Sequence, residues 1–102
     1  AARTLFLDEP TNNLDLSHQQ TIFKVARRIA GSNTAVCMVL HDLNQAIRYA
    51  DRICILDKGR MALDGFPAEI ADSPECERIF GVPIRRIQVP GTTCPYLVFG
   101  DD

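Results

Sequence analysis

The 102-residue sequence lacks the features that would place it in a membrane or on nucleic acid. No apolar run approaches the roughly 20 residues of a membrane-spanning helix, and the amino end has neither a basic head nor a secretory core. The 11 basic and 13 acidic residues give a net charge of -2, which offers no electrostatic reason to expect binding to nucleic acid or to an anionic membrane. These absences predict a cytoplasmic globular chain with one modest core.

The sequence also lacks a cysteine pattern that would indicate a metal or redox site. Its four cysteines, at positions 37, 54, 76 and 94, form no CxxC pair. Cys37 and Cys54 lie within apolar runs, where a free cysteine behaves as a small buried hydrophobe. We therefore expect a structural role for the cysteines, with these two buried.

Apolar periodicity predicts alternating strands and helices. Continuous apolar runs at residues 4–8, 34–40 and 52–56 predict strands buried on both faces, and helical spacing predicts helices over residues 16–30 and 43–50. Asp15 can cap the first helix and Gly31 can end it. Strand, helix, strand, helix, strand is typical of an α/β fold, in which right-handed crossovers join parallel strands.

The last third of the chain predicts an accessory tail. After a return strand at residues 61–64, two short helices over residues 67–72 and 74–80 each open on a proline. Residues 83–99 predict a hairpin that turns near Gly91. We therefore divide the chain into residues 1–66 and a small helical and β-hairpin tail, residues 67–102, of the same domain.

Polar residues follow the first two predicted strands at the point where each ends. Asp8 and Glu9 end the first strand, and His41 follows the second. Neighbouring parallel strands lie ~4.8 Å apart, so their carboxyl ends share one edge of the sheet, where open α/β proteins bind ligands. One carboxylate can hold hydrated Mg²⁺, the other can orient or deprotonate a water, and the imidazole can donate to an anion. Together, Asp8, Glu9 and His41 predict a phosphate-hydrolysis site. Taken without the histidine, the two acidic residues before Pro10 could also be a solvated turn at the end of a strand.

Two segments carry a family resemblance. LFLDEPTNNLD at residues 5–15 and VLHDLNQAIRYADRICILDKGRMALDG at residues 39–65 resemble the carboxyl-terminal part of an ABC transporter ATP-binding subunit, and the likeness covers nearly the whole chain. The resemblance implies the carboxyl-terminal half of a P-loop NTPase-like parallel sheet.

The resemblance also implies roles for individual residues. Asp8 would hold Mg²⁺ through water, Glu9 would polarise the water that attacks ATP, and His41 would hydrogen-bond the γ-phosphate. Residues 12–15 resemble the D-loop, which implies that Asn13 and Asp15 act at the nucleotide site and at the interface with a second ATP-binding subunit.

The implied partners are that second subunit and transmembrane permease subunits, which would hold the chain at the inner face of the plasma membrane. The phrases LDLSHQ and HDLNQAIRYAD and the tail FGVPIRRIQVPGTTCPYLVFG look most like importers of iron-siderophore, haem or cobalamin type. TNNLD also resembles the TNHLD of ABC-type translation factors. An ABC-type DNA-repair ATPase and a non-catalytic interaction module are further alternatives.

Three motifs of the family are missing: the GxxxxGK[ST] phosphate loop, the glutamine-bearing loop and an LSGGQ-like signature. We therefore expect the chain to be a piece that neither binds ATP tightly nor hydrolyses it alone. The family places the phosphate-loop strand between the strands that residues 34–40 and 52–56 resemble. Without it, we expect the exposed strand edges to pair in an altered way or with another copy.

Overall fold

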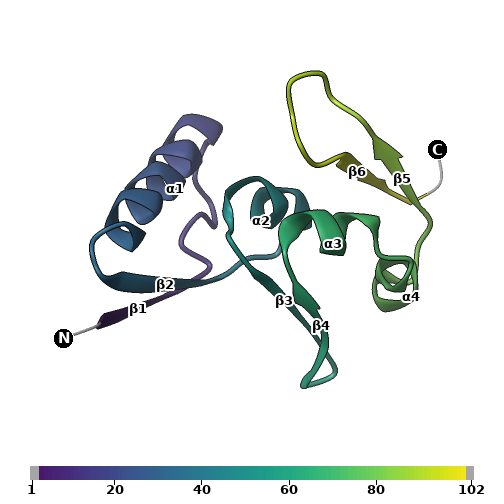
Figure 1. The fold of residues 1–102 in the computed structure, drawn as a ribbon, viewed down its shortest axis with the longest axis horizontal. Coiled ribbons are helices and arrows are strands. Elements are labelled where there is room, and N and C mark those ends of the chain that lie inside the picture. Colours follow the sequence, from purple (N-terminus) through teal and green to yellow (C-terminus); the bar gives the residue numbers. More distant parts are fainter. Residues whose placement is uncertain (1–2, 101–102) are drawn as a thin grey trace. The chain divides into compact units, whose positions relative to one another are not determined.

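The computed structural model describes residues 3–100 (Figure 1). In chain order its elements are β1 (Arg3–Asp8), α1 (Leu16–Ala30), β2 (Thr34–Val39), α2 (Leu43–Tyr49), β3 (Ile53–Asp57), β4 (Arg60–Gly65), α3 (Pro67–Asp72), α4 (Glu75–Phe80), β5 (Ile84–Ile87) and β6 (Tyr96–Phe99). These match the predicted helices and strands to within one or two residues. The sequence predicts one core, but the described chain separates into two compact units, residues 3–43 and 44–100.

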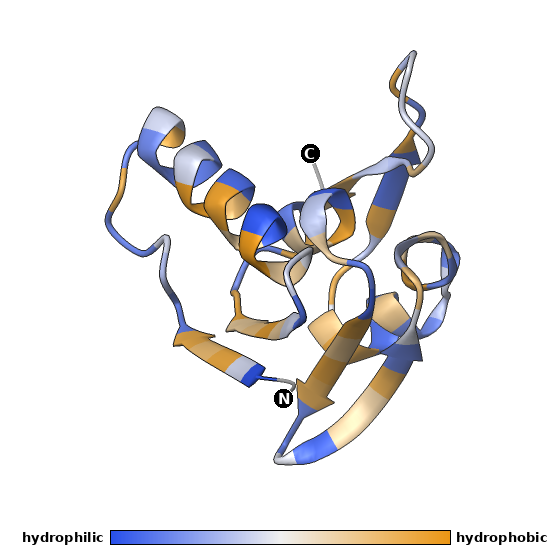
Figure 2. Cartoon of the chain, turned by 60° about the vertical axis from the view of Figure 1, so that its left-hand side comes forward, coloured by the Kyte–Doolittle hydropathy of each residue, from blue (hydrophilic) through white to orange (hydrophobic). Residues whose placement is uncertain are grey.

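The first unit is a β-α-β crossover that carries the predicted site. Strands β1 and β2 pair in parallel, in a register that runs from Arg3 opposite Thr34 to Asp8 opposite Val39. Helix α1 joins them and packs against β2, with Phe23 and Ala26 buried. Figure 2 shows that the strands are mostly apolar and that apolar and polar residues alternate along α1. This matches the helical spacing predicted from the sequence.

One face of this two-stranded sheet is exposed, contrary to the predicted burial on both faces. Phe6 is 62% exposed and Val39 39% exposed, and Cys37, which lies opposite Phe6 and two residues before Val39, is exposed as well. The expected burial of Cys37 is therefore wrong, and so is that of Cys54, which is exposed on β3. For Cys37 the physical reason is that a strand is buried on both faces only when the sheet is covered by two layers, whereas the first unit has a single helix among its described residues.

The third predicted strand does not join the parallel sheet. Among residues 3–100, β2 pairs with β1 alone, and β3 pairs antiparallel with β4. Our prediction of a third parallel strand is therefore wrong for this chain, and the altered pairing that we considered is absent from the described residues. The family resemblance gives the reason, because it implies an intervening strand whose motif the sequence lacks. Pairing with another copy stays a prediction.

The second unit packs α2, the β3–β4 hairpin and the tail around a core of its own. Its most deeply buried apolar side chains include Ile70, Ala71, Cys76 and Leu97, none more than 2% exposed. The tail ends in the predicted hairpin, in which β5 and β6 pair antiparallel and the loop between them contains Gly91 with φ of 83°. The division at residue 66 stays a prediction.

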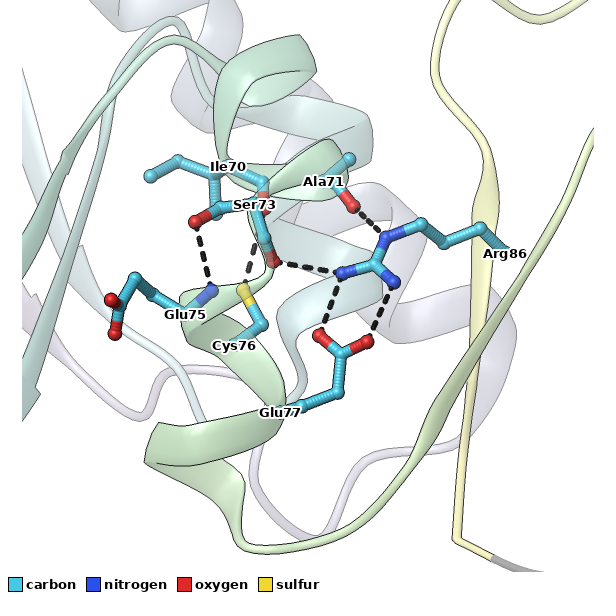
Figure 3. A network of polar contacts seen from close by, with 7 residues as sticks. All are labelled: Ile70, Ala71, Ser73, Glu75, Cys76, Glu77 and Arg86. Carbon is cyan, nitrogen blue, oxygen red and sulfur yellow. Dashed lines mark hydrogen bonds and ion pairs between the residues drawn. The ribbon is translucent and has the colours of Figure 1, made fainter.

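An arginine on β5 ties the two tail helices together (Figure 3). The Arg86 guanidinium donates to the carbonyls of Ala71 and Ser73 at the end of α3, and to both carboxylate oxygens of Glu77 on α4 at 3.0 Å. This pairing lowers the pKa of Glu77 and raises that of Arg86. The planar guanidinium thereby satisfies helix-end carbonyls that have no partner within α3.

Candidate functional site

The carboxyl ends of β1 and β2 bring Glu9 and His41 together. The parallel ladder continues one residue past β1, because the Glu9 N–H donates to the Val39 carbonyl at 3.0 Å. This places the residues after both strands at one edge, where Nε2 of His41 meets Oε1 of Glu9 directly. The imidazole is 78% exposed and the carboxylate 34% exposed, so solvent reaches both groups. The contact is the one that parallel pairing predicts.

The backbone at Glu9 is held in an unfavourable conformation. Its φ of 50° lies in the left-handed region, which costs a residue with a side chain roughly 1–2 kcal/mol. The Glu9 carbonyl accepts a hydrogen bond from the Asn12 N–H at 3.1 Å, which closes a turn directly after the strand. Strained non-glycine residues of this kind cluster at functional sites.

Asp8 presents its side chain differently from Glu9. It lies opposite Val39 in the ladder and is exposed, and within residues 3–100 its carboxylate makes no hydrogen bond or ion pair. Asp8 is the last residue of β1, whereas Glu9 follows the strand with a left-handed backbone, so the two adjacent carboxylates can serve two partners. One carboxylate is thus paired with His41 and the other is available.

The available carboxylate fits a magnesium ion that keeps most of its waters. No group of three His, Cys, Asp or Glu side chains among the described residues is arranged to hold a metal directly. Mg²⁺ commonly retains several waters and takes one or two carboxylates together with phosphate oxygens. A single exposed carboxylate such as that of Asp8 is compatible with a water-rich site of this kind.

Residues 11–14 form a loop that is fixed by a glutamine the sequence reasoning did not single out. The Gln19 side-chain amide, one turn into α1, donates to the carbonyls of Thr11 at 3.3 Å and of Leu14 at 3.1 Å. Thr11 is 7% exposed, and Asn13 has φ of 63°. An amide one turn into a helix that follows a polar loop is the signal that could have identified Gln19.

Asn13 and Asp15 lie on this loop rather than in the Glu9 and His41 contact. No hydrogen bond or ion pair within the described chain joins either of them to Glu9 or His41. Asp15 caps α1 as predicted, since its carboxylate accepts from the His18 N–H at 3.0 Å. It also accepts from the Ser17 hydroxyl and contacts His18 Nδ1 at 2.9 Å. The structure thus shows Asp15 as a cap, and its role at an interface stays a prediction.

The cap predicts a pH dependence of stability. The His18 N–H and the Ser17 hydroxyl hold the pKa of the Asp15 carboxyl below its ordinary value. The charged cap therefore stabilises the folded state fully above the ordinary pKa of about 3.9, and this contribution is lost as the pH falls through the lower folded-state pKa. Asp15→Asn keeps an acceptor oxygen without the charge. Urea unfolding from pH 7 to pH 3 should show the stability difference between the native chain and this variant shrinking below about pH 4; a difference independent of pH would contradict the assignment.

Comparison with solved structures identifies the class of protein. The chain superposes with a TM-score of 0.75 and 27% identity on a structure described as an inward-facing ABC transporter of metal-chelate type, over 94% of this chain and 39% of that one. It matches cbiO1 of Clostridium perfringens, part of the ABC transporter complex cbiONQ, with a TM-score of 0.59 and 30% identity over 74% of this chain and 30% of that one. UvrA2 of Deinococcus radiodurans, at 21% identity and a TM-score of 0.62 over 86% of this chain and 12% of that one, shares the fold alone. In fold, the chain matches the carboxyl-terminal part of the P-loop NTPase domain of ABC-type ATPases.

Named relatives show which ABC-type proteins the chain is similar to in sequence. The chain is 47% identical over 89 residues to the hemin import ATP-binding protein HmuV of Rhodococcus jostii, covering 87% of this chain and 30% of the relative. It is 42% identical over 96 residues to the protein of that name from Myxococcus xanthus, covering 94% of this chain and 36% of the relative. No protein-family model matches the chain. The chain thus spans about a third of the length of these relatives.

No helix among residues 3–100 combines the length and apolar character that crossing a membrane requires.

Proposed function

We propose that the chain is the part of an ABC importer ATPase subunit that positions Mg²⁺, activates the attacking water and contacts the γ-phosphate of ATP. The observation that carries this proposal is the meeting of Glu9 and His41 at the end of a parallel strand pair, one residue after Asp8, whose carboxylate has no partner among the described residues. An acid, a second acid and an imidazole at one sheet edge match the needs of phosphoryl transfer to water. The similarity to ATP-binding import proteins supports the same reading.

The three side chains divide the chemistry. Asp8 would hold Mg²⁺ through water, and the bound ion would offset negative charge on the phosphate oxygens. Glu9 would orient the attacking water and accept its proton, while His41 would donate from Nε2 to a γ-phosphate oxygen. Because that nitrogen faces Glu9 in the structure, ATP would replace the Glu9 oxygen with a phosphate oxygen at His41. The exchange would free the Glu9 carboxylate for water.

The partners follow from the proposed class. A second ATP-binding subunit would complete each nucleotide site, and Asn13 and Asp15, on the exposed loop before α1, are the residues that we assign to this interface. Permease subunits would hold the protein at the inner face of the plasma membrane. The phosphate loop would come from the parent protein outside these residues, so we expect the 102-residue chain alone not to hydrolyse ATP.

Haem is the cargo that the comparisons favour, because the relatives described above are named for hemin import. The names favour import over translation or DNA repair, and an iron-siderophore complex and cobalamin remain the alternatives within import.

Reconstitution of the full-length protein with its permease in proteoliposomes would test the cargo. We expect ATP-dependent uptake of haem, with no uptake of cobalamin or of a ferric siderophore at the same concentration. Uptake of either alternative without haem would reassign the cargo and leave the ATPase assignment intact. Failure to hydrolyse ATP with any cargo would overturn the function itself.

A further inference from the structure

Residues 11–14 form a turn that carries Asn13 just before α1. The chain is fixed on both sides of this turn, by the β1–β2 ladder before it and by the cap of α1 after it. Within the turn, the Leu14 N–H reaches the Thr11 carbonyl only at 3.4 Å, which is long for a backbone hydrogen bond. Asn13 is exposed, and its φ of 63° is a conformation that few side chains adopt without cost. The shape of the turn therefore depends on a contact from outside it.

Gln19 supplies that contact. Its Nε2 donates to the carbonyls of Thr11 at 3.3 Å and of Leu14 at 3.1 Å, the first and last residues of the turn. A primary amide has two N–H groups on one nitrogen, so it can serve two acceptors at once. Side chains of an α-helix lean toward its amino end, and Gln19 is the fourth residue of α1, so its amide is directed at the preceding turn.

We propose that Gln19 is a positioning residue for Asn13. By bonding both ends of the turn, it holds the left-handed backbone that presents Asn13 to a second ATP-binding subunit. Gln19 itself is assigned no contact with that subunit or with nucleotide. The contacts that carry the effect are the two bonds from its Nε2, and they lie within the first compact unit. The proposal rests on the proposed function, which assigns Asn13 to the subunit interface.

Hydrogen exchange of the 102-residue chain tests whether Gln19 holds the turn. Gln19→Met removes the amide but keeps a long side chain that favours helix. The N–H groups of Asn12 and Leu14, which donate to carbonyls in and before the turn, should exchange about 2-fold to 10-fold faster, the factor that one net hydrogen bond contributes. Amides of the β1–β2 ladder should keep their native rates. Native exchange at both turn amides would overturn the proposal.

Subunit association in the full-length protein tests the consequence. If the turn without the glutamine amide holds its binding conformation about a tenth of the time, the apparent Kd of the dimer rises about 10-fold. We therefore expect Gln19→Met to weaken association by about 3-fold to 30-fold, measured by sedimentation with Mg²⁺ and a nonhydrolysable ATP analogue. The temperature is one at which circular dichroism shows every variant folded. Association equal to that of the native protein would refute the positioning role.

Gln20→Met is the matched control. It makes the same chemical change at the next residue of α1, whose exposed side chain makes no hydrogen bond or ion pair with the described residues. This variant should associate as tightly as the native protein and should keep native exchange in the turn. An equal loss in both variants would show that the composition of the helix, rather than the bonds of Gln19, controls association, and the proposal would fail.

A double substitution tests whether Gln19 acts through Asn13. Asn13→Gly removes the side chain and suits the left-handed backbone. Adding Gln19→Met to it should weaken association by less than about twofold further, because interacting sites are not additive. A full additional loss would mean that Gln19 acts independently of Asn13, contrary to the proposal. A native protein that does not associate with the ATP analogue would count against the proposed function instead, whatever the exchange rates of the turn.

Discussion

Replacing Glu9 with glutamine in the full-length protein should lower ATP turnover by about 10²-fold to 10⁴-fold, the usual contribution of a general acid or base. Glutamine keeps the size of the side chain and an oxygen that can face His41, but it cannot take a proton from the attacking water. Because the interaction matters chiefly in the transition state, the affinity for ATP should change little. Steady-state hydrolysis and equilibrium nucleotide binding, measured on the same preparation, check the two halves of this expectation.

Glu75→Gln provides the matched control. It makes the same chemical change on helix α4, where the carboxylate is 48% exposed and pairs with Arg78 outside the candidate site. Turnover should stay at the native level in this variant. Native turnover in Glu9→Gln, or an equal loss in Glu75→Gln, would remove Glu9 from the role of water-activating residue.

Leu97→Ala should lower the free energy of unfolding of the 102-residue chain by about 2–5 kcal/mol, the usual range for a leucine truncated inside a core. The side chain is 1% exposed, so its removal leaves a cavity as well as losing burial. Urea denaturation followed by circular dichroism measures the change. The effect is large relative to the few kcal/mol of stability that a small unit holds.

Leu56→Ala makes the same substitution at an exposed position. Leu56 lies on β3 and is 69% exposed, so its truncation should alter stability by no more than about 0.5 kcal/mol. If the two variants were destabilised equally, the Leu97 side chain would not belong to the core of this unit.

The local structure of the chain follows closely from its sequence. The spacing of apolar residues, together with the residues that begin and end helices, predicted the helices and strands. The Asp15 cap and the prolines that open the tail helices are examples. These signals act within a few residues of the chain. The meeting of Glu9 and His41 was also predictable, since parallel pairing places both strand ends at one edge. The roles of Asp8, Glu9 and His41 in catalysis remain predictions that the variants above test.

Long-range partners were less predictable. Apolar runs at β1 and β2 predict burial on both faces of the sheet, yet Cys37 is exposed. An apolar strand can be covered on both faces, but its sequence does not show whether a second covering layer is present. The two bonds of Asn44 to Leu97 join residues 53 positions apart, and no local pattern marks them. Gln19 was missed although its signal is local, because its amide acts on the preceding loop rather than within its own helix.

The backbone of Glu9 has a consequence for how the chain would change under selection. The φ of 50° at this position costs glycine or asparagine less conformational energy than it costs glutamate. Selection for folding alone would therefore favour glycine or asparagine here. If Glu9 has the proposed role, the glutamate is retained there for its chemistry and against the conformational preference of the main chain. Variants selected only for thermal resistance are therefore expected to lose this carboxylate early. They would be more stable and would no longer hydrolyse ATP.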